Sequence, residues 1–214
     1  MKTSIWLVAS LLSLGTTACV NLERSRDLAN ADVAPQVTAR QVCSNCHGVD
    51  GNSVSPNFPR LAGQQSAYIV AQLQNFRSKQ RSDPAGFYYM WGISRNLTDG
   101  QIQGLADYYA QQTPTPNPSA DTARLTLGKD IFENGITAEE VPACKVCHGA
   151  HAEGLATFPR LAGQHQDYLV KQLNIFQSTE GRPETPMKQV SHLLTSEQMR
   201  AVAAYLQALP SAQL

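Results

Sequence analysis

The strongest constraint on this chain is that one sequence pattern occurs twice. The segment FPRLAGQ at 58–64 recurs letter for letter at 158–164. A Cys-x-x-Cys-His motif begins at Cys43 and again at Cys144. The offset between the copies drifts from 101 to 100 to 97 residues, so the copies differ by small loop deletions. Because internal repetition marks a repeated structural unit, the sequence predicts two homologous domains.

Both copies have helical signals. Thr98 with Gln101, and Thr195 with Gln198, fit the capping-box pattern that starts a helix. Apolar residues follow each cap at helical spacing, and these are Ile102, Leu105, Ala106 and Tyr109, then Met199, Val202, Ala203 and Leu206. We expect a middle helix after Gly63 and Gly163, and a first helix before each cysteine motif. No segment alternates like a strand, so the predicted fold class is all-α.

The first helix differs between the copies. The second copy carries Gly128 and Phe132 there, and the first copy has neither residue before Cys43. The sequence therefore leaves the helix crossing of the first domain open.

A Pro-rich segment, TPTPNPSA at 113–120, separates the copies. Alternate prolines exclude a helix and favour an extended, semi-stiff linker. We therefore predict a first domain at 35–112, the linker at 113–120 and a second domain at 121–210.

The N-terminus reads as an export signal at 1–18. It has a positive start at Lys2, an apolar run at 5–14 and small residues up to Ala18. The run is shorter than the roughly 20 residues needed to span a bilayer. Cys19 resembles the lipidated cysteine of a lipoprotein, and the alternative is ordinary cleavage that leaves a free thiol. Residues 19–34 would then form a tether. The expected location is the periplasm, with a membrane anchor if Cys19 is lipidated.

Charge excludes one class of partner. Lys plus Arg and Asp plus Glu both number 17 in the 214 residues, and no basic stripe is present. Binding to nucleic acid is therefore not expected.

The two Cys-x-x-Cys-His motifs predict two covalently attached haem c groups. On a helical turn, Cys43 and Cys46 project to one side, as do Cys144 and Cys147. His47 and His148 then follow as iron ligands. Zinc is the first alternative, but the gap between the cysteine pairs is far longer than the usual 15–20 residues. A thioredoxin-like redox pair is the second, and it usually lies in a βαβ setting that this chain lacks.

Met90 and Met187 are the candidates for the second axial ligand of each iron. Each lies seven residues before the leucine that precedes the threonine cap. Thioether ligation raises the reduction potential of haem. Met199 lies on the apolar face of the last helix and is expected to be a core residue.

Further residues of the repeat receive supporting roles. The carbonyls of Pro59 and Pro159 are candidates to accept a hydrogen bond from the ligand histidines. Arg60 and Arg160 either meet haem propionates or are solvated. The remaining histidines are expected at the surface, and these are His151, His165 and His192.

Taken together, the doubled motifs and the methionine-to-threonine spacing resemble the dihaem cytochrome c4 family over about residues 35–210. The resemblance implies two tandem class I cytochrome c domains related by a pseudo-twofold axis. It also implies a periplasmic electron carrier that donates to terminal oxidases, with iron ligands His47 and Met90, and His148 and Met187.

Three functions follow from this reading. The first is a one-electron carrier, not an enzyme, between a reductase-type or dehydrogenase donor and a terminal oxidase or reductase. The second is the cytochrome subunit of a periplasmic dehydrogenase, for example one that oxidises sulfur compounds. The third is a dihaem peroxidase, which needs an open axial position that the two matching methionines disfavour.

Overall fold

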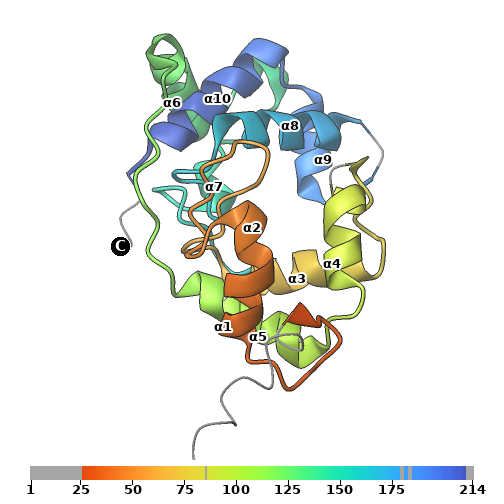
Figure 1. The fold of residues 1–214 in the computed structure, drawn as a ribbon. Helices are drawn as coiled ribbons and strands as arrows, with labels where there is room; N and C mark the ends of the chain where they lie inside the picture. Colours follow the sequence, from red (N-terminus) through yellow and green to blue (C-terminus); the bar gives the residue numbers. More distant parts are fainter. Residues whose placement is uncertain (1–25, 85, 179–180, 183–184, 211–214) are drawn as a thin grey trace, which may run out of the picture.

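The computed structural model describes residues 26–84, 86–178, 181–182 and 185–210. Two helical domains lie against each other, with α1 to α5 in one and α6 to α10 in the other (Figure 1). Within the described ranges the backbone forms only two isolated bridges, Ile136 with Val141 and Leu155 with Phe158, and no strand. The predicted all-α class with two tandem domains is confirmed.

The first domain begins with α1 (Pro35–Thr38), a π-helical turn (Ala39–Cys43) and α2 (Ser44–His47) in direct succession. The remaining elements are α3 (Ser66–Arg77), a second π-helical segment (Gly86–Trp91), α4 (Gly92–Ser94) and α5 (Asp99–Ala110). The second domain contains α6 (Leu125–Asn134), α7 (Lys145–His148), α8 (Gln166–Gln177), α9 (Pro186–His192) and α10 (Ser196–Ala208), with short 3₁₀ turns at Thr122–Arg124 and Thr137–Glu139.

Both predicted capping boxes are present. The Thr98 hydroxyl accepts from the Gln101 backbone N–H, and the Gln101 side chain accepts from the Thr98 N–H at 2.9 Å. Thr195 and Gln198 make the same pair at the start of α10. Each cap satisfies backbone donors that the helix leaves free and contributes about 1 kcal/mol.

A glycine admits the close helix crossing in each domain, but on opposite helices. In the second domain, a Cβ on Gly128 of α6 would lie 2.0 Å from the Ala201 carbonyl oxygen of α10. In the first domain, a Cβ on Gly104 of α5 would lie 2.2 Å from Cγ of Pro35 in α1. The small residue that the first helix lacks is therefore supplied by the helix it packs against.

Part of the predicted tether packs on the first domain. Leu28 lies against the apolar cluster that contains Ile102 and Leu105. The Gln101 amide also donates to the Leu28 carbonyl at 3.3 Å and to the Asn30 carbonyl at 3.0 Å. These contacts join residues 28–30 to the start of α5.

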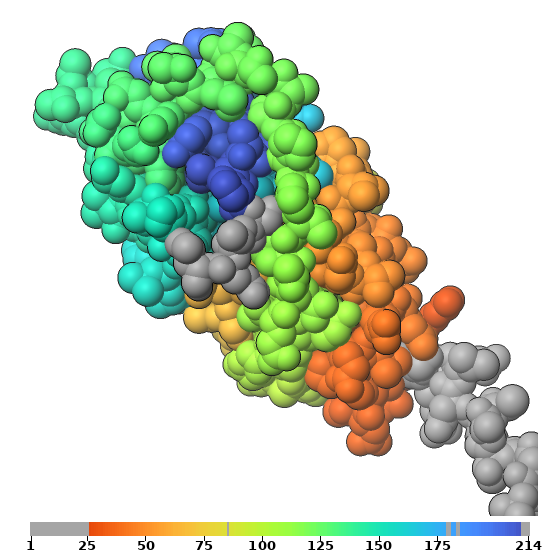
Figure 2. Space-filling model, turned by 90° about the vertical axis from the view of Figure 1, so that its left-hand side faces the viewer, coloured from red at the N-terminus to blue at the C-terminus, as the bar shows by residue number. Residues whose placement is uncertain are grey.

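The Pro-rich segment lies along the boundary between the domains, where Figure 2 shows it in green. The Asn52 side chain donates to the Thr113 carbonyl at 3.0 Å and accepts from the Thr115 N–H at 2.9 Å. Asn117 donates to the Gly163 carbonyl of the second domain at 3.1 Å, and Pro114 is buried. The linker is therefore bonded to both domains.

A buried polar cluster forms a second part of the boundary. Arg81 pairs with Asp83 at 2.8 Å and donates to Gln72 at 2.7 Å and to Gln172 of the other domain at 3.2 Å. Arg182 donates to the same two glutamines. Charges this deeply buried are costly unless they are paired and hydrogen-bonded, so the cluster fixes how the domains meet.

The expectation that His165 lies at the surface is wrong. Its side chain is buried, and its Nε2 lies 2.9 Å from the Ser53 carbonyl of the first domain. Gln65, at the matching position of the first repeat, donates to the Glu153 carbonyl at 2.9 Å. Pseudo-twofold packing, which the sequence pattern does not show, therefore buries this histidine. His151 and His192 are exposed, as predicted.

The burial of His165 predicts a pH-dependent stability. Burial lowers its pKa, and the nearby Arg60 adds to this, while the Ser53 carbonyl and Asp167 oppose it. The unfolded state then binds more protons than the folded state below about pH 6.5. Stability supplied by neutral His165 is thus present above that pH and lost as the pH falls below it.

We expect His165→Gln to lose less stability than the unchanged protein between pH 7 and pH 5. Glutamine keeps a donor for the Ser53 carbonyl without a titrating ring. Thermal unfolding midpoints at both pH values measure the effect, with His192→Gln as the exposed control. Equal losses in His165→Gln and the unchanged protein would contradict the assignment.

Candidate haem sites

Each Cys-x-x-Cys-His motif ends in a short helix, α2 or α7, that a glycine terminates. Cys43 is the last residue of the π-helical turn before α2, and Cys144 is the N-cap of α7. The chain leaves the two helices at Gly48 and Gly149 with φ of 78° and 86°. Positive φ is accessible to glycine without strain. The chain can therefore turn away at once, and each histidine ends up buried while its motif stays near the surface.

The histidine rings are held in the same way in both domains. Nδ1 of His47 lies 2.8 Å from the Pro59 carbonyl oxygen, and Nδ1 of His148 lies 3.0 Å from that of Pro159. A carbonyl only accepts, so Nδ1 carries the proton and donates. This leaves Nε2 of each ring as the nitrogen suited to a metal.

Aromatic contacts complete this arrangement. The Phe58 ring packs edge-on against His47, and the Phe158 ring against His148, both at 6.2 Å between centroids. The proline of FPRLAGQ thus orients the imidazole and the phenylalanine packs beside it.

Burial shifts the pKa of the histidine and of the first cysteine in both motifs. It lowers the pKa of His47 and of His148 and so favours the neutral imidazole that binds iron. It also raises the pKa of the Cys43 and Cys144 thiols to about 11. Without a bound group, these two cysteines are therefore protonated at neutral pH.

The methionine candidates occupy matching backbone positions. Met90 lies in the π-helical segment, where its carbonyl accepts from Ser94 Oγ at 2.7 Å. Met187 lies near the start of α9, where its carbonyl accepts from Ser191 Oγ at 2.6 Å. Both side chains are half-buried, whereas Met199 is buried in the core, as predicted.

In the first domain, contacts lead from the methionine segment to the histidine. Tyr89, the neighbour of Met90, packs edge-on against Phe58 at 5.9 Å, and Phe58 contacts His47. Met90 itself packs against the same apolar cluster as Cys43. The structure therefore brings the cysteine, histidine and methionine segments of this domain together.

The repeated arginines are buried, so the alternative that they are solvated is wrong. Arg60 donates to the Gly163 carbonyl at 3.0 Å, to Asn52 at 2.6 Å and to the Thr115 hydroxyl. Nε and Nη2 of Arg160 are buried and, within the part of the chain that the structure describes, lack a hydrogen-bond partner. Buried donors of this kind suit a carboxylate, and haem carries two.

The doubled helical domain and its histidine turn define a c-type cytochrome, and comparison with known proteins agrees. The cytochrome c family model matches residues 34–113 and 125–210. Cytochrome c4 of Azotobacter vinelandii is 34% identical and aligns over 95% of this chain and 98% of its own. The solved cytochrome c4 of Acidithiobacillus ferrooxidans superposes with a TM-score of 0.74 at 41% identity, covering 78% of this chain and 98% of that one.

Another relative is named for the enzyme from which it accepts electrons. The thiosulfate dehydrogenase electron acceptor of Stutzerimonas stutzeri is 42% identical over 78% of each chain. The chain belongs to the cytochrome c4 family. It is a dihaem electron carrier with one covalently bound haem c in each domain.

Sequence reasoning missed the buried polar residues at the boundary where the two domains meet. Gln64, Gln164, Arg81, Arg182 and His165 all lie buried at the domain boundary. The signal for the first two was the glutamine that ends both copies of FPRLAGQ. For the others, the sequence alone did not indicate which faces of the domains meet.

Proposed function

We propose that Cys43 and Cys46 hold the first haem and that Cys144 and Cys147 hold the second. In this assignment the iron is bound by His47 and Met90 in the first domain, and by His148 and Met187 in the second. The observation that carries it is the matched Nδ1-to-proline hydrogen bond of the two buried histidines.

The bound haem iron supplies one-electron redox chemistry, and the chain's residues hold its surroundings fixed. Pro59 and Pro159 lock the orientation of the imidazoles and increase their basicity. The buried Nε and Nη2 of Arg160 would supply hydrogen-bond donors to a haem carboxylate. Two protein ligands per iron leave no open position for a substrate, which favours electron transfer over peroxidase chemistry.

We further propose that the carrier works in the periplasm, with 1–18 as its export signal and Cys19 as a lipid anchor. These residues lie outside the described part of the structure. Among the described residues, no helix has the length and apolar character needed to cross a bilayer. Intact mass of the mature protein tests the anchor: added acyl chains on Cys19 support it, and an unmodified thiol refutes it.

The proposed partners are redox proteins. The donor is a quinol–cytochrome c reductase-type complex or a dehydrogenase, and the acceptor is a terminal oxidase or reductase. The thiosulfate dehydrogenase electron acceptor among the relatives supports a second candidate, in which a sulfur-oxidising dehydrogenase delivers the electrons. Purification from native membranes distinguishes the two by which complex is retained.

The methionine assignment predicts separate effects for Met90→Ala and Met187→Ala. Each variant should keep two haems but lose about half of the near-infrared absorbance of methionine-bound ferric haem. The potential of one haem should also fall, because thioether ligation raises it. Met199→Leu, a change in the buried core, serves as the control and should leave the absorbance intact. A full band in Met90→Ala or Met187→Ala would exclude that residue as a ligand.

A further inference from the structure

We propose that Gln64 and Gln164 are positioning residues that act across the domain boundary, each tuning the haem of the opposite domain. The inference rests on the proposed function, because it takes His47 and His148 as the iron ligands. Each glutamine acts through one peptide group, which joins Pro59 to Arg60 in the first domain and Pro159 to Arg160 in the second.

The peptide group between Pro59 and Arg60 is hydrogen-bonded at both ends. Its carbonyl accepts from Nδ1 of His47 at 2.8 Å. Its N–H donates to Oε1 of Gln164, in the other domain, at 2.8 Å. One amide therefore links the histidine of the first domain to a side chain of the second.

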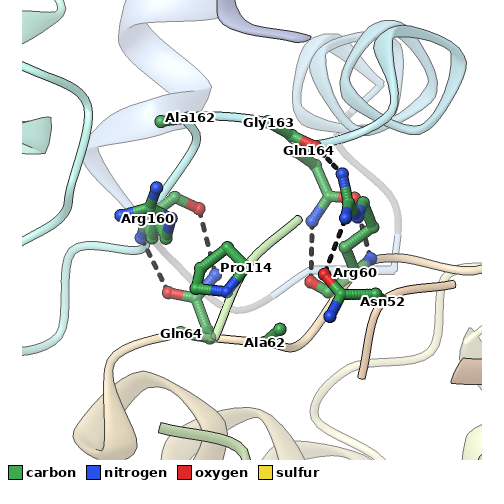
Figure 3. Close-up of a pocket in the computed structure, with 9 residues that line it drawn as sticks. All are labelled: Asn52, Arg60, Ala62, Gln64, Pro114, Arg160, Ala162, Gly163 and Gln164. Atoms are coloured by element: carbon green, nitrogen blue, oxygen red, sulfur yellow. Dashed lines mark hydrogen bonds between the residues drawn. The ribbon is translucent and has the colours of Figure 1, made fainter. Parts of the chain in front are cut away.

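The second domain repeats this arrangement with the roles exchanged. The Pro159 carbonyl accepts from Nδ1 of His148 at 3.0 Å, and the Arg160 N–H donates to Oε1 of Gln64 at 2.7 Å. Figure 3 shows both glutamines reaching across the boundary. The two paths are thus related by the same pseudo-twofold symmetry as the domains.

Each glutamine amide is fixed by a second bond. Nε2 of Gln164 donates to the Arg60 carbonyl at 2.9 Å, and Nε2 of Gln64 donates to the Arg160 carbonyl at 3.0 Å. Both side chains are buried, and the cavity they line measures about 10 Å³. This is room for about one water molecule, so bulk solvent does not compete with these bonds.

Hydrogen bonds in such a chain strengthen one another. An amide that donates from its N–H carries more negative charge on its oxygen, and in a buried site this strengthens the bond that the oxygen accepts by about 10–30%. A stronger acceptor at Nδ1 makes the imidazole more basic. A more basic ligand stabilises ferric over ferrous iron. Each glutamine therefore lowers the potential of the haem across the boundary.

The test uses Gln164→Leu and Gln64→Leu in the full dihaem protein. The two reduction potentials are measured by spectroelectrochemistry, and the Nδ1–H resonances of the two histidines by NMR. The Met90→Ala variant identifies which signals belong to the first domain.

The matched control is Gln65→Leu. It also loses a hydrogen bond across the boundary, to the Glu153 carbonyl at 2.9 Å. The N–H of that peptide donates to the backbone carbonyl of His148 at 2.8 Å, whereas the carbonyls that accept from the imidazole Nδ1 atoms are those of Pro59 and Pro159. If the loss of any hydrogen bond between the domains shifted the reduction potentials, Gln65→Leu would shift them as well.

We expect a crossed pattern. Gln164→Leu should raise the potential of the first haem and shift the His47 resonance, and Gln64→Leu should do the same for the second haem and His148. The equilibrium between the two half-reduced forms should change by about two- to fivefold, in opposite directions in the two variants. Gln65→Leu should leave both haems nearly unchanged.

Three results would overturn the inference: equal shifts at both haems, a shift confined to the haem of the substituted domain, or the same shift in the control. Failure of the proposed function looks different. In that case the unchanged protein itself would lack histidine-bound iron in one or both domains.

Discussion

A double variant, Cys144→Ala with Cys147→Ala, is expected to carry one haem per chain in place of two. The first domain keeps its own cysteine pair and its own apolar cluster around Ile102 and Leu105. The second domain loses its covalent link, and α7 is only four residues long. A helix this short has little stability of its own, so His148 alone would hold haem weakly.

Haem content by the pyridine haemochrome assay, together with intact mass, measures this loss. The control is Lys145→Ala with Val146→Ala, which changes the two exposed residues between the cysteines and should keep both haems. Two covalent haems in the cysteine variant would exclude Cys144 and Cys147 as attachment residues. A colourless unchanged protein would exclude the haem reading altogether.

Gly128→Val is expected to destabilise the second domain by about 3 kcal/mol. An added Cβ would lie 2.0 Å from the Ala201 carbonyl oxygen and 2.8 Å from Tyr205 Cβ, both in α10. Backbone atoms of a packed helix cannot move aside as a flexible side chain does, so α6 and α10 would separate. The crossing also covers Phe132, which is fully buried and packs against Tyr205.

Denaturant unfolding followed at the haem signals of each domain measures this effect. The signals of the second domain should be lost at lower denaturant concentration than in the unchanged protein. Gly92→Ala is the matched control, because a Cβ there meets no described atom within 4 Å. A midpoint in Gly128→Val equal to that of the control would show that the crossing tolerates a larger residue.

Local chemistry explains why much of the fold was predictable. The caps at Thr98 and Thr195 and the spacing of the apolar residues after them are short-range signals, and α5 and α10 begin where they indicate. The cysteine motifs are equally local. The contacts of Pro59 and Pro159 with the histidines connect residues 11 or 12 positions apart, and the repeat placed them in equivalent positions.

The residues that lie where the two domains meet were not predictable, because their contacts are long-range in the sequence. His165 contacts Ser53 across 112 positions, and Gln164 contacts Arg60 across 104. A polar side chain that binds a distant carbonyl has no periodicity or spacing that reveals its partner. Sequence reasoning therefore placed His165 at the surface and gave Gln164 no role, and only the packing of the two domains shows that both are buried.

The linker has a consequence for the symmetry of the molecule. It runs along one side of the boundary and can follow only one of two equivalent paths. Thr115 of the linker therefore reaches the guanidinium of Arg60, while the guanidinium of Arg160 keeps buried donors free of partners among the described residues. Two identical subunits placed around an axis would give equivalent side chains identical surroundings. Joining the two halves through a single strap gives the matching arginines of the repeat different hydrogen-bond partners, so the duplicated molecule is asymmetric at its centre.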